Sequence, residues 1–188
     1  MENKEKWFFK LFIEVCKSIN SSLEIQEVLK MISRQVPQVL NVKACAILLL
    51  NKVDKKLEVG ASYGLSEAYL NKGPVDAEKS IVDSLRGKTV LVCDAKHDDR
   101  IQYPEEAERE HIASILSVPI QVRGNVIGVL RLYTEQVLEF SQDEIEFVWA
   151  LAEMGGIAIE NARLYDHLKT DYEKLMNDVH QWFDYGSM

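Results

Sequence analysis

The sequence predicts an α+β fold, with an antiparallel sheet that carries helices on its faces and a long helix at the C-terminal end. Two strand pairs predict the sheet: residues 43–50 with 56–62, and residues 112–122 with 125–133. The third observation is the stretch 141–183, which lacks proline and keeps a helical pattern throughout. Strands joined by short turns pair antiparallel, so the fold class follows from these features together.

Composition places the chain among globular proteins of one domain plus an extension. It has 188 residues, of which 47% are hydrophobic and 28% charged. The formal charge of −8 repels phosphate backbones and argues against a nucleic-acid partner. Three widely spaced cysteines, Cys16, Cys45 and Cys93, favour a reducing compartment, the cytoplasm. Lys10 and Glu14 interrupt the apolar N-terminal run, which excludes a membrane span there and disfavours a signal peptide.

Two helices are expected before the sheet. Residues 7–19 place their apolar side chains on one helical face, and a second apolar stripe runs over 25–36. Ser21 and Glu24 fit a capping box that would start the second helix.

Short elements are expected between the two strand pairs. One helix is predicted near 65–70, and a second between Ser80 and Gly87. A strand over 88–93 follows, and a polar loop with a short acidic helix occupies 94–110.

The second strand pair turns around Arg123-Gly124-Asn125. Both of its strands are nearly continuously apolar, so both sheet faces should be covered. Pro119 cannot donate to a ladder and therefore indicates an edge or a bulge at its position. Ser141 and Glu144 form a capping box ahead of the long helix.

Four stretches of the chain carry a resemblance to a known family. They are SSLEIQEVLKMI before ACAILLL, then SIVDSLRGKTVLVCDAKHDDR, then IASILSVPIQVRGNVIGVLRLY, and finally FSQDEIEFVWALAEMGGIAIENARLYDHL. In this order, over residues 20–168, they resemble the GAF domain, a regulatory and sensor family, either stand-alone or within a larger signalling protein. The resemblance implies a six-stranded antiparallel sheet with helices on both faces. It also implies a ligand pocket near the loop after the second strand and around residues 93–110.

The resemblance leaves the ligand open. GAF domains bind cyclic nucleotides, bilins, haem, small metabolites or nothing. Cyclic nucleotide is disfavoured because Thr134-Glu135 stands where binding members carry Asn-Lys, and a covalent bilin is disfavoured because the Asp-Ile-Pro motif is absent. A few members reduce free methionine sulfoxide with clustered cysteines, but no second cysteine is close to Cys93 in sequence. We therefore expect a non-enzyme, with a thiol reductase as the weakest alternative.

Positions within the resemblance imply a polar pocket lining. The expected residues are Tyr63, Cys93, Asp94, Arg100, Tyr103, His111, Ser114, Arg131 and Tyr133. Strand alternation puts Ser114 and Ser117 on opposite faces, so at most one of them belongs to the pocket. The alternatives are a buried, inert Cys93 and a solvated loop in which Arg100 pairs an aspartate. The carboxylates and histidines lack the spacing of a metal site, so no metal is expected.

The long helix carries a heptad seam that begins at Leu151. Its distal members, beyond the reach of the domain, are Tyr165, Leu168, Tyr172, Leu175, Val179 and Trp182. They predict a homodimer, to which the first helix could add; the alternative is a helix that lies back on its own domain. The expected division is a helix over 1–20, a GAF-like domain over 21–163 and a coiled-coil extension over 164–188. The favoured function is small-molecule sensing with an output domain or kinase partner, and the alternative is a ligand-free dimerisation module.

Overall fold

The computed structural model describes residues 2–21, 24–51, 53, 55–73, 75–76 and 82–185. Its elements, in chain order, are α1 (Glu2–Ser21), α2 (Ile25–Leu40), β1 (Ala44–Asn51), β2 (Lys56–Tyr63), α3 (Glu67–Leu70), β3 (Val75–Asp76), α4 (Val82–Leu85), β4 (Val90–Val92), α5 (Pro104–Arg109), β5 (Ser114–Val122), β6 (Asn125–Thr134) and α6 (Gln142–Tyr185).

The strands form one antiparallel sheet in the order β3-β2-β1-β6-β5-β4. The α+β class with an antiparallel sheet is confirmed, but the expectation of six full strands needs correction. Five strands have three or more residues, and the sixth place is taken by β3, which has only two. Pro74 directly precedes β3 and has no N–H to donate, which suits a short strand at the sheet edge.

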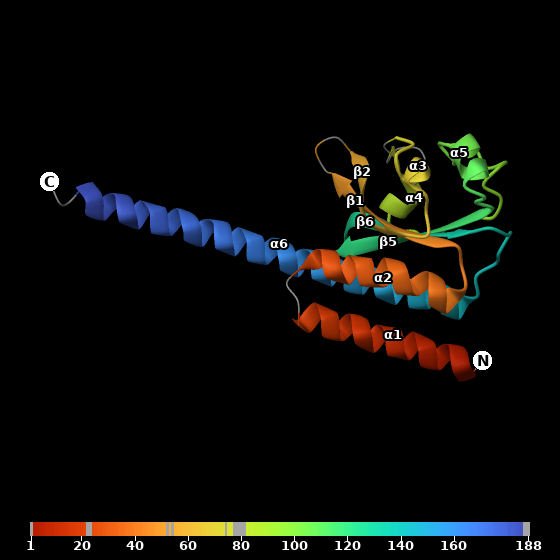
Figure 1. The fold of residues 1–188 in the computed structure, drawn as a ribbon, viewed down its shortest axis with the longest axis horizontal. Helices are drawn as coiled ribbons and strands as arrows, with labels where there is room; N and C mark the ends of the chain where they lie inside the picture. Colours follow the sequence, from red (N-terminus) through yellow and green to blue (C-terminus); the bar gives the residue numbers. More distant parts are fainter. Residues whose placement is uncertain are drawn as a thin grey trace.

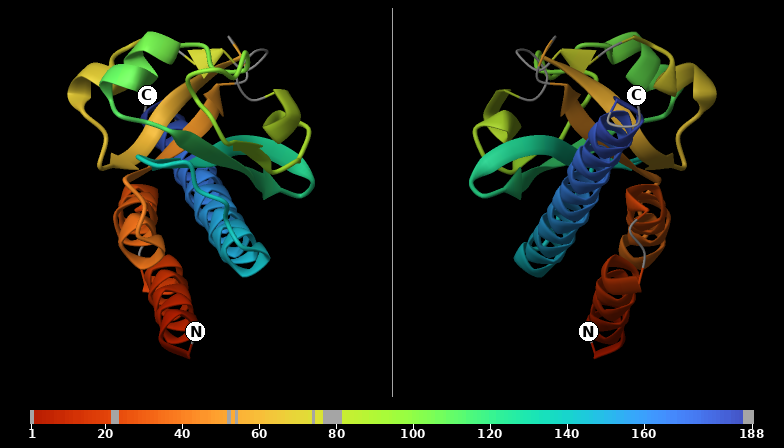
Figure 2. Two further views of the ribbon diagram at one scale, coloured as in Figure 1. Left: turned by 90° about the vertical axis from the view of Figure 1, so that its right-hand side faces the viewer. Right: turned by 90° about the vertical axis from the view of Figure 1, so that its left-hand side faces the viewer.

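Helices cover both faces of the sheet, as predicted. The long helices α1, α2 and α6 lie on one face, and the short helices α3, α4 and α5 lie on the other (Figures 1 and 2). Each face has its own core. Leu29, Ile32 and Leu130 belong to the helix-side core, whereas Leu48 and Ile115 belong to the core under the short helices.

The first helix packs on its own domain through α2 and α6. Leu11 and Val15 are buried, and the Phe8 ring stacks on Phe147 with 4.0 Å between ring centroids. Trp7 and Phe9, in contrast, keep more than half of their surface exposed. Helix α1 therefore has one face in the core and an apolar face left to solvent.

The two expected capping boxes have different outcomes. At α6, the Ser141 N–H donates to the Glu144 carboxylate at 2.8 Å and the Glu144 N–H donates to Ser141 Oγ at 3.3 Å, as predicted. The box at Ser21 is wrong, because α1 continues to Ser21 and a helical residue cannot serve as the N-cap of the next helix. Glu24 is the N-cap of α2 instead, without a side-chain capping bond.

The second hairpin has the expected turn and the expected irregularity at its proline. Arg123 and Gly124 both have positive φ angles, of 50° and 78°, as a two-residue type I′ turn requires. Pro119 lies beyond the three residues of β5 that pair with β4, so this stretch of β5 is locally an edge. A register shift follows directly, between Ile120 and Gln121.

Helix α6 leaves the domain after Ala162, the last buried side chain along it that the structure describes. Figure 1 shows its C-terminal half extending well past the sheet. The seam residues Tyr165, Leu168, Tyr172 and Leu175 are 48–70% exposed. The side chains of Val179 and Trp182 lie outside the described residues. Within the described ranges, no helix is both long and apolar enough to cross a membrane.

Candidate functional site

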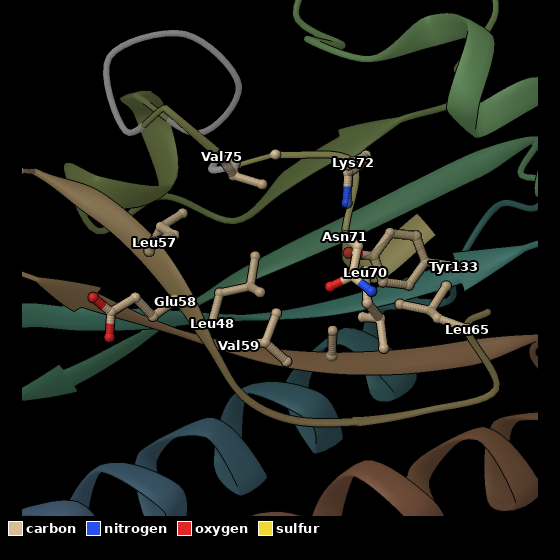
Figure 3. A pocket seen from close by; sticks show the side chains of 12 residues that line it. Leu48, Leu57, Glu58, Val59, Leu65, Leu70, Asn71, Lys72, Val75 and Tyr133 are labelled. Carbon is tan, nitrogen blue, oxygen red and sulfur yellow. The ribbon is translucent and has the colours of Figure 1, made fainter. Parts of the chain in front are cut away.

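A cavity of about 380 Å³ lies on the sheet face that carries the short helices. Strands β1 and β2 form its floor, and α3 with the loop that follows covers it (Figure 3). Its walls are mostly apolar, and the polar groups among them are few. The lining residues are Ala46, Leu48, Leu57, Glu58, Val59, Leu65, Leu70, Asn71, Lys72, Gly73, Val75 and Tyr133.

Strand alternation builds the floor of this cavity. Ala46 and Leu48 point to the cavity side, whereas the alternating residues Cys45 and Ile47 belong to the helix-side core. The apolar run of β1 therefore supplies two different cores, one on each face of the sheet. The size of the cavity, and its apolar walls with a few convergent polar groups, are typical of a small-molecule site.

A smaller polar recess of about 10 Å³, no more than one water molecule needs, adjoins this cavity, and Lys72 and Val75 line both. Its other walls include Tyr69, Tyr103 and Arg131. Arg131 is 5% exposed, and its Nε donates to Ser117 Oγ at 3.2 Å. A buried arginine is rare in proteins and is held in place by such bonds.

Lys72 is the second cation of this recess. Its Nζ donates to the Tyr69 carbonyl oxygen at 2.9 Å and lies 3.7 Å from the centroid of the Tyr69 ring. Burial, and next the positive charge of Arg131, lower the pKa of Lys72 from its ordinary 10.5 to about 8. Glu110 and Glu106 act in the opposite direction with smaller effects. The recess therefore places two cationic groups in one poorly hydrated place.

Two tyrosines also belong to this site: Tyr133 lines the cavity and Tyr69 lines the recess. The Tyr69 and Tyr133 rings meet edge to face, with 6.0 Å between their centroids. Burial raises the pKa of both phenols, so both stay neutral and can act as hydrogen-bond donors.

Three of the expected pocket residues line these cavities: Tyr103, Arg131 and Tyr133. Tyr63 lines neither, and the reason is a bulge in β2. The register shifts between Ile47 and Leu48, so that Gly60 is the extra residue on β2. An extra residue reverses the alternation beyond it, which turns Tyr63 away from the cavity face.

Ser114 does not line the cavities either. Its Oγ donates to the Cys93 carbonyl oxygen at 2.8 Å and accepts from the Leu138 N–H at 3.3 Å. Ser117, three residues on, lies on the cavity face as the partner of Arg131. Of the two serines, Ser117 and not Ser114 therefore lies on the cavity face.

The loop from Cys93 to His111 makes contacts of its own and lines the recess only through residues 101–103. Asp94 accepts a hydrogen bond from His97 at 2.8 Å, and this bond lowers the pKa of the carboxyl. Arg100 pairs with Asp98, which is the solvated-loop alternative. His111 is exposed and has a φ of 57° just after α5.

All three cysteines are free, and they differ in solvent exposure. Cys93 is exposed rather than buried, and Cys45 is fully buried. Burial raises the pKa of the Cys45 thiol, which keeps it protonated and weakly reactive. Within the described part of the chain, no group of three or more potential metal ligands gathers.

Sequence reasoning missed Lys72, Tyr69 and Asn71. The stretch Asn71-Lys72-Gly73-Pro74 carries a turn signal, which gave no reason to place a cation in a cavity. The usable signal was the expected pocket beside the loop after the second strand, where Lys72 is the basic residue of the turn.

The GAF family model matches residues 22–160. The chain belongs to the GAF domain family. Its fold matches the solved GAF domain of a phosphoenolpyruvate-protein phosphotransferase from Coxiella burnetii with a TM-score of 0.75 at 20% identity, covering 85% of this chain and 96% of that one.

Two curated relatives of this GAF domain are regulatory proteins. The methyl sulfide methyltransferase-associated sensor of Methanosarcina acetivorans is 26% identical over 82% of the chain, which spans 16% of the relative's length. The formate hydrogenlyase transcriptional activator of Salmonella typhimurium is 20% identical over 93% of the chain, which spans 26% of its length. The chain thus corresponds to about a quarter or less of each relative. GAF domains are regulatory domains of signalling proteins, and these relatives fit that role.

Proposed function

We propose that this GAF domain is a small-molecule-sensing regulatory module, whose ligand occupies the cavity between the sheet and α3. The observation that carries the proposal is the cavity itself. It combines about 380 Å³ of space, apolar walls and a corner where Lys72 and Tyr133 converge. A site of this kind suits a metabolite of modest size, held by its apolar part and oriented by a few polar contacts.

The sheet supports transmission from the cavity to the long helices. On β6, Arg131 and Tyr133 line the two cavities, while the alternating residues Leu130 and Leu132 belong to the helix-side core. A ligand that shifts β6 therefore acts on the packing of α6 and α2. Such coupling requires that the ligand bind one arrangement of the helices better than the other.

The output side of the proposal is a homodimer joined along α6. The exposed seam of Tyr165, Leu168, Tyr172 and Leu175 is apolar and has no neighbour within the described chain. A second copy is the natural cover for a heptad seam, and the exposed Trp7 and Phe9 of α1 would extend the same interface. The module would act in the cytoplasm on an output domain or a kinase. The seam also favours a second candidate, a dimerisation module that binds no ligand.

Native mass spectrometry of freshly purified protein separates these two candidates. A sensing module should carry a small molecule that is lost in the variant Val59→Trp, because Val59 lines the cavity and a larger side chain there fills it. Val137→Trp is the matched control, since Val137 is exposed and does not line the cavity. A protein that shows only its own mass, together with unchanged stability on exposure to metabolite mixtures, would favour the ligand-free module.

A further inference from the structure

We infer that the ligand of this cavity is a small organic oxyanion, a carboxylate or a phosphate monoester, whose charged group lies against Lys72, at the end of the cavity that adjoins the recess of Arg131. This inference rests on the proposed sensing function and adds the chemical class of the ligand. The observation behind it is the convergence of two cationic side chains, from separate elements, on the recess that adjoins the main cavity.

Arg131 is built into this position by the sheet. It lies on β6, paired with Ala46 of β1 on one side and with Ser117 of β5 on the other. The bond from its Nε to Ser117 Oγ fixes the guanidinium. A guanidinium fixed in advance adds positive potential at the adjoining end of the cavity without having to reorganise when an anion arrives.

Lys72 connects the recess with the apolar chamber, because it lines both. Keeping two cations close in a poorly hydrated place costs free energy through desolvation and mutual repulsion. An anion against Lys72 offsets the repulsion between the two cations, which favours an oxyanion over a neutral ligand. The groups that face Lys72 are Tyr69 on α3, Tyr103 beside α5, Arg131 on β6, and Glu106 and Glu110 around α5.

The acidic groups nearby do not remove this preference. Glu110 accepts hydrogen bonds from the Ser66 N–H, at 2.8 Å, and from the Ser66 hydroxyl. Its effect on Lys72, like that of Glu106, is smaller than the effect of Arg131. At the other end of the cavity, Glu58 is exposed and accepts from Asn51 Nδ2 at 2.9 Å.

This arrangement gives the ligand an orientation. Figure 3 places Glu58 and Lys72 at opposite ends of the cavity, with Leu48 and Val59 between them. The anionic head should therefore lie at the Lys72 end, and an apolar body of a few carbons should lie against the leucines of the floor.

Isothermal titration calorimetry of the full chain tests the charge and the head group together. The probes are butyrate, butyl phosphate and butyramide at constant ionic strength, because they share a short alkyl body and differ in the head. We expect at least one of the two anions to bind about tenfold or more tightly than butyramide. The stronger of the two anions then identifies a carboxylate or a phosphate ligand.

The pH dependence of probe binding is an independent test of the role of Lys72. Because an anion favours protonated Lys72, binding should weaken about tenfold between about pH 7 and about pH 9. Butyramide binding should not change in this way. Equal pH dependence for all three probes would contradict a role for Lys72.

Variants assign the effect to the two cations. Lys72→Met should abolish the preference for the anion, whereas Lys88→Met, at an exposed lysine outside the cavity, should keep it. Arg131→Gln should reduce the preference, because it removes positive potential beside the cavity. If the buried Arg131 position does not tolerate the change, the comparison of Lys72→Met with Lys88→Met decides the assignment. Butyramide binding as tightly as both anions would overturn the oxyanion assignment and leave the sensing function standing. If neither anion binds at millimolar concentration, the assignment is likewise overturned, while a retained neutral molecule in the mass spectrum would still support sensing.

Discussion

At the scale of single residues, the chemistry of this GAF domain is concentrated in Lys72 and Arg131. Both are cationic, both line the polar recess, and each lies in a setting where a charged group is costly. The cost is visible in Lys72, whose pKa is lowered to about 8 by burial and by Arg131. A group titrating so close to neutral pH makes the stability of the protein depend on pH.

Lys72 should make the domain more stable as the pH rises from about 8 towards 10.5. Its folded-state pKa of about 8 lies below the ordinary 10.5, so in this window the unfolded chain binds more protons than the folded one. Urea unfolding of the wild type should therefore show a free energy of unfolding that rises between about pH 7.5 and about pH 9.5 relative to Lys72→Met. Lys88→Met should keep the rise. An identical pH profile for wild type and Lys72→Met would contradict a buried, charge-strained Lys72.

Individual site residues were predictable only where local order is regular. Of the residues expected from the resemblance, Arg131, Tyr133 and Tyr103 line the cavity or its recess, and their role in binding stays a prediction. Tyr63 lines neither, because the extra residue at Gly60 reverses the strand alternation and nothing in the sequence marks which residue of β2 is extra. The contact of Lys72 with the Tyr69 ring depends on how a turn folds back over the sheet, and turn signals do not specify this.

At the scale of elements, the glycine pair of α6 explains how closely this helix packs. A Cβ at residue 156 would lie 2.6 Å from the Gln121 carbonyl oxygen of β5, so only glycine fits there. A Cβ at residue 155 would meet Ile32 and Leu29 at ordinary contact distances of 3.7 and 3.9 Å. A side chain at residue 156 would therefore clash with β5, whereas a methyl group at residue 155 has room.

Alanine substitutions at these two glycines should have effects of opposite sign. Gly156→Ala should lower the free energy of unfolding by about 1–3 kcal/mol, because α6 must move away from β5. Gly155→Ala should raise it by up to about 1 kcal/mol, because alanine favours the helix and finds space. Urea unfolding of both variants measures the difference. Equal effects at the two positions would mean that α6 does not approach β5 as closely as this packing requires.

The elements themselves were largely predictable from periodicity and turn residues. The hairpin around Arg123-Gly124, the capping box at Ser141 and the long helix all follow from local signals. The capping box predicted at Ser21 was wrong because the same pair, a serine with a glutamate three residues later, also occurs where one helix ends. The two-residue β3 carries too little pattern for any prediction.

At the scale of the whole molecule, the sheet separates the face that carries the cavity from the face that carries the long helices. The cavity lies among the short helices, and α1, α2 and α6 lie on the opposite side (Figure 1). Strands β1 and β6 contribute alternate residues to both faces, and the proposed coupling of the cavity to α6 would run through them. Beyond Ala162 the described part of α6 has no buried side chain, so its apolar seam is the surface on which an output would act.

The proposed signalling through α6 requires that two copies pair along this seam, and analytical ultracentrifugation measures that pairing most directly. The wild type should sediment as a dimer, and the double variant Leu168→Asp, Leu175→Asp should sediment as a monomer, because two charges in an apolar seam have no partners. The double variant His167→Asp, Thr170→Asp introduces the same number of acidic groups on the same helix at exposed positions off the seam, and it should remain a dimer. A wild type that sediments as a monomer, or a seam variant that keeps the mass of a dimer, would contradict dimerisation through α6.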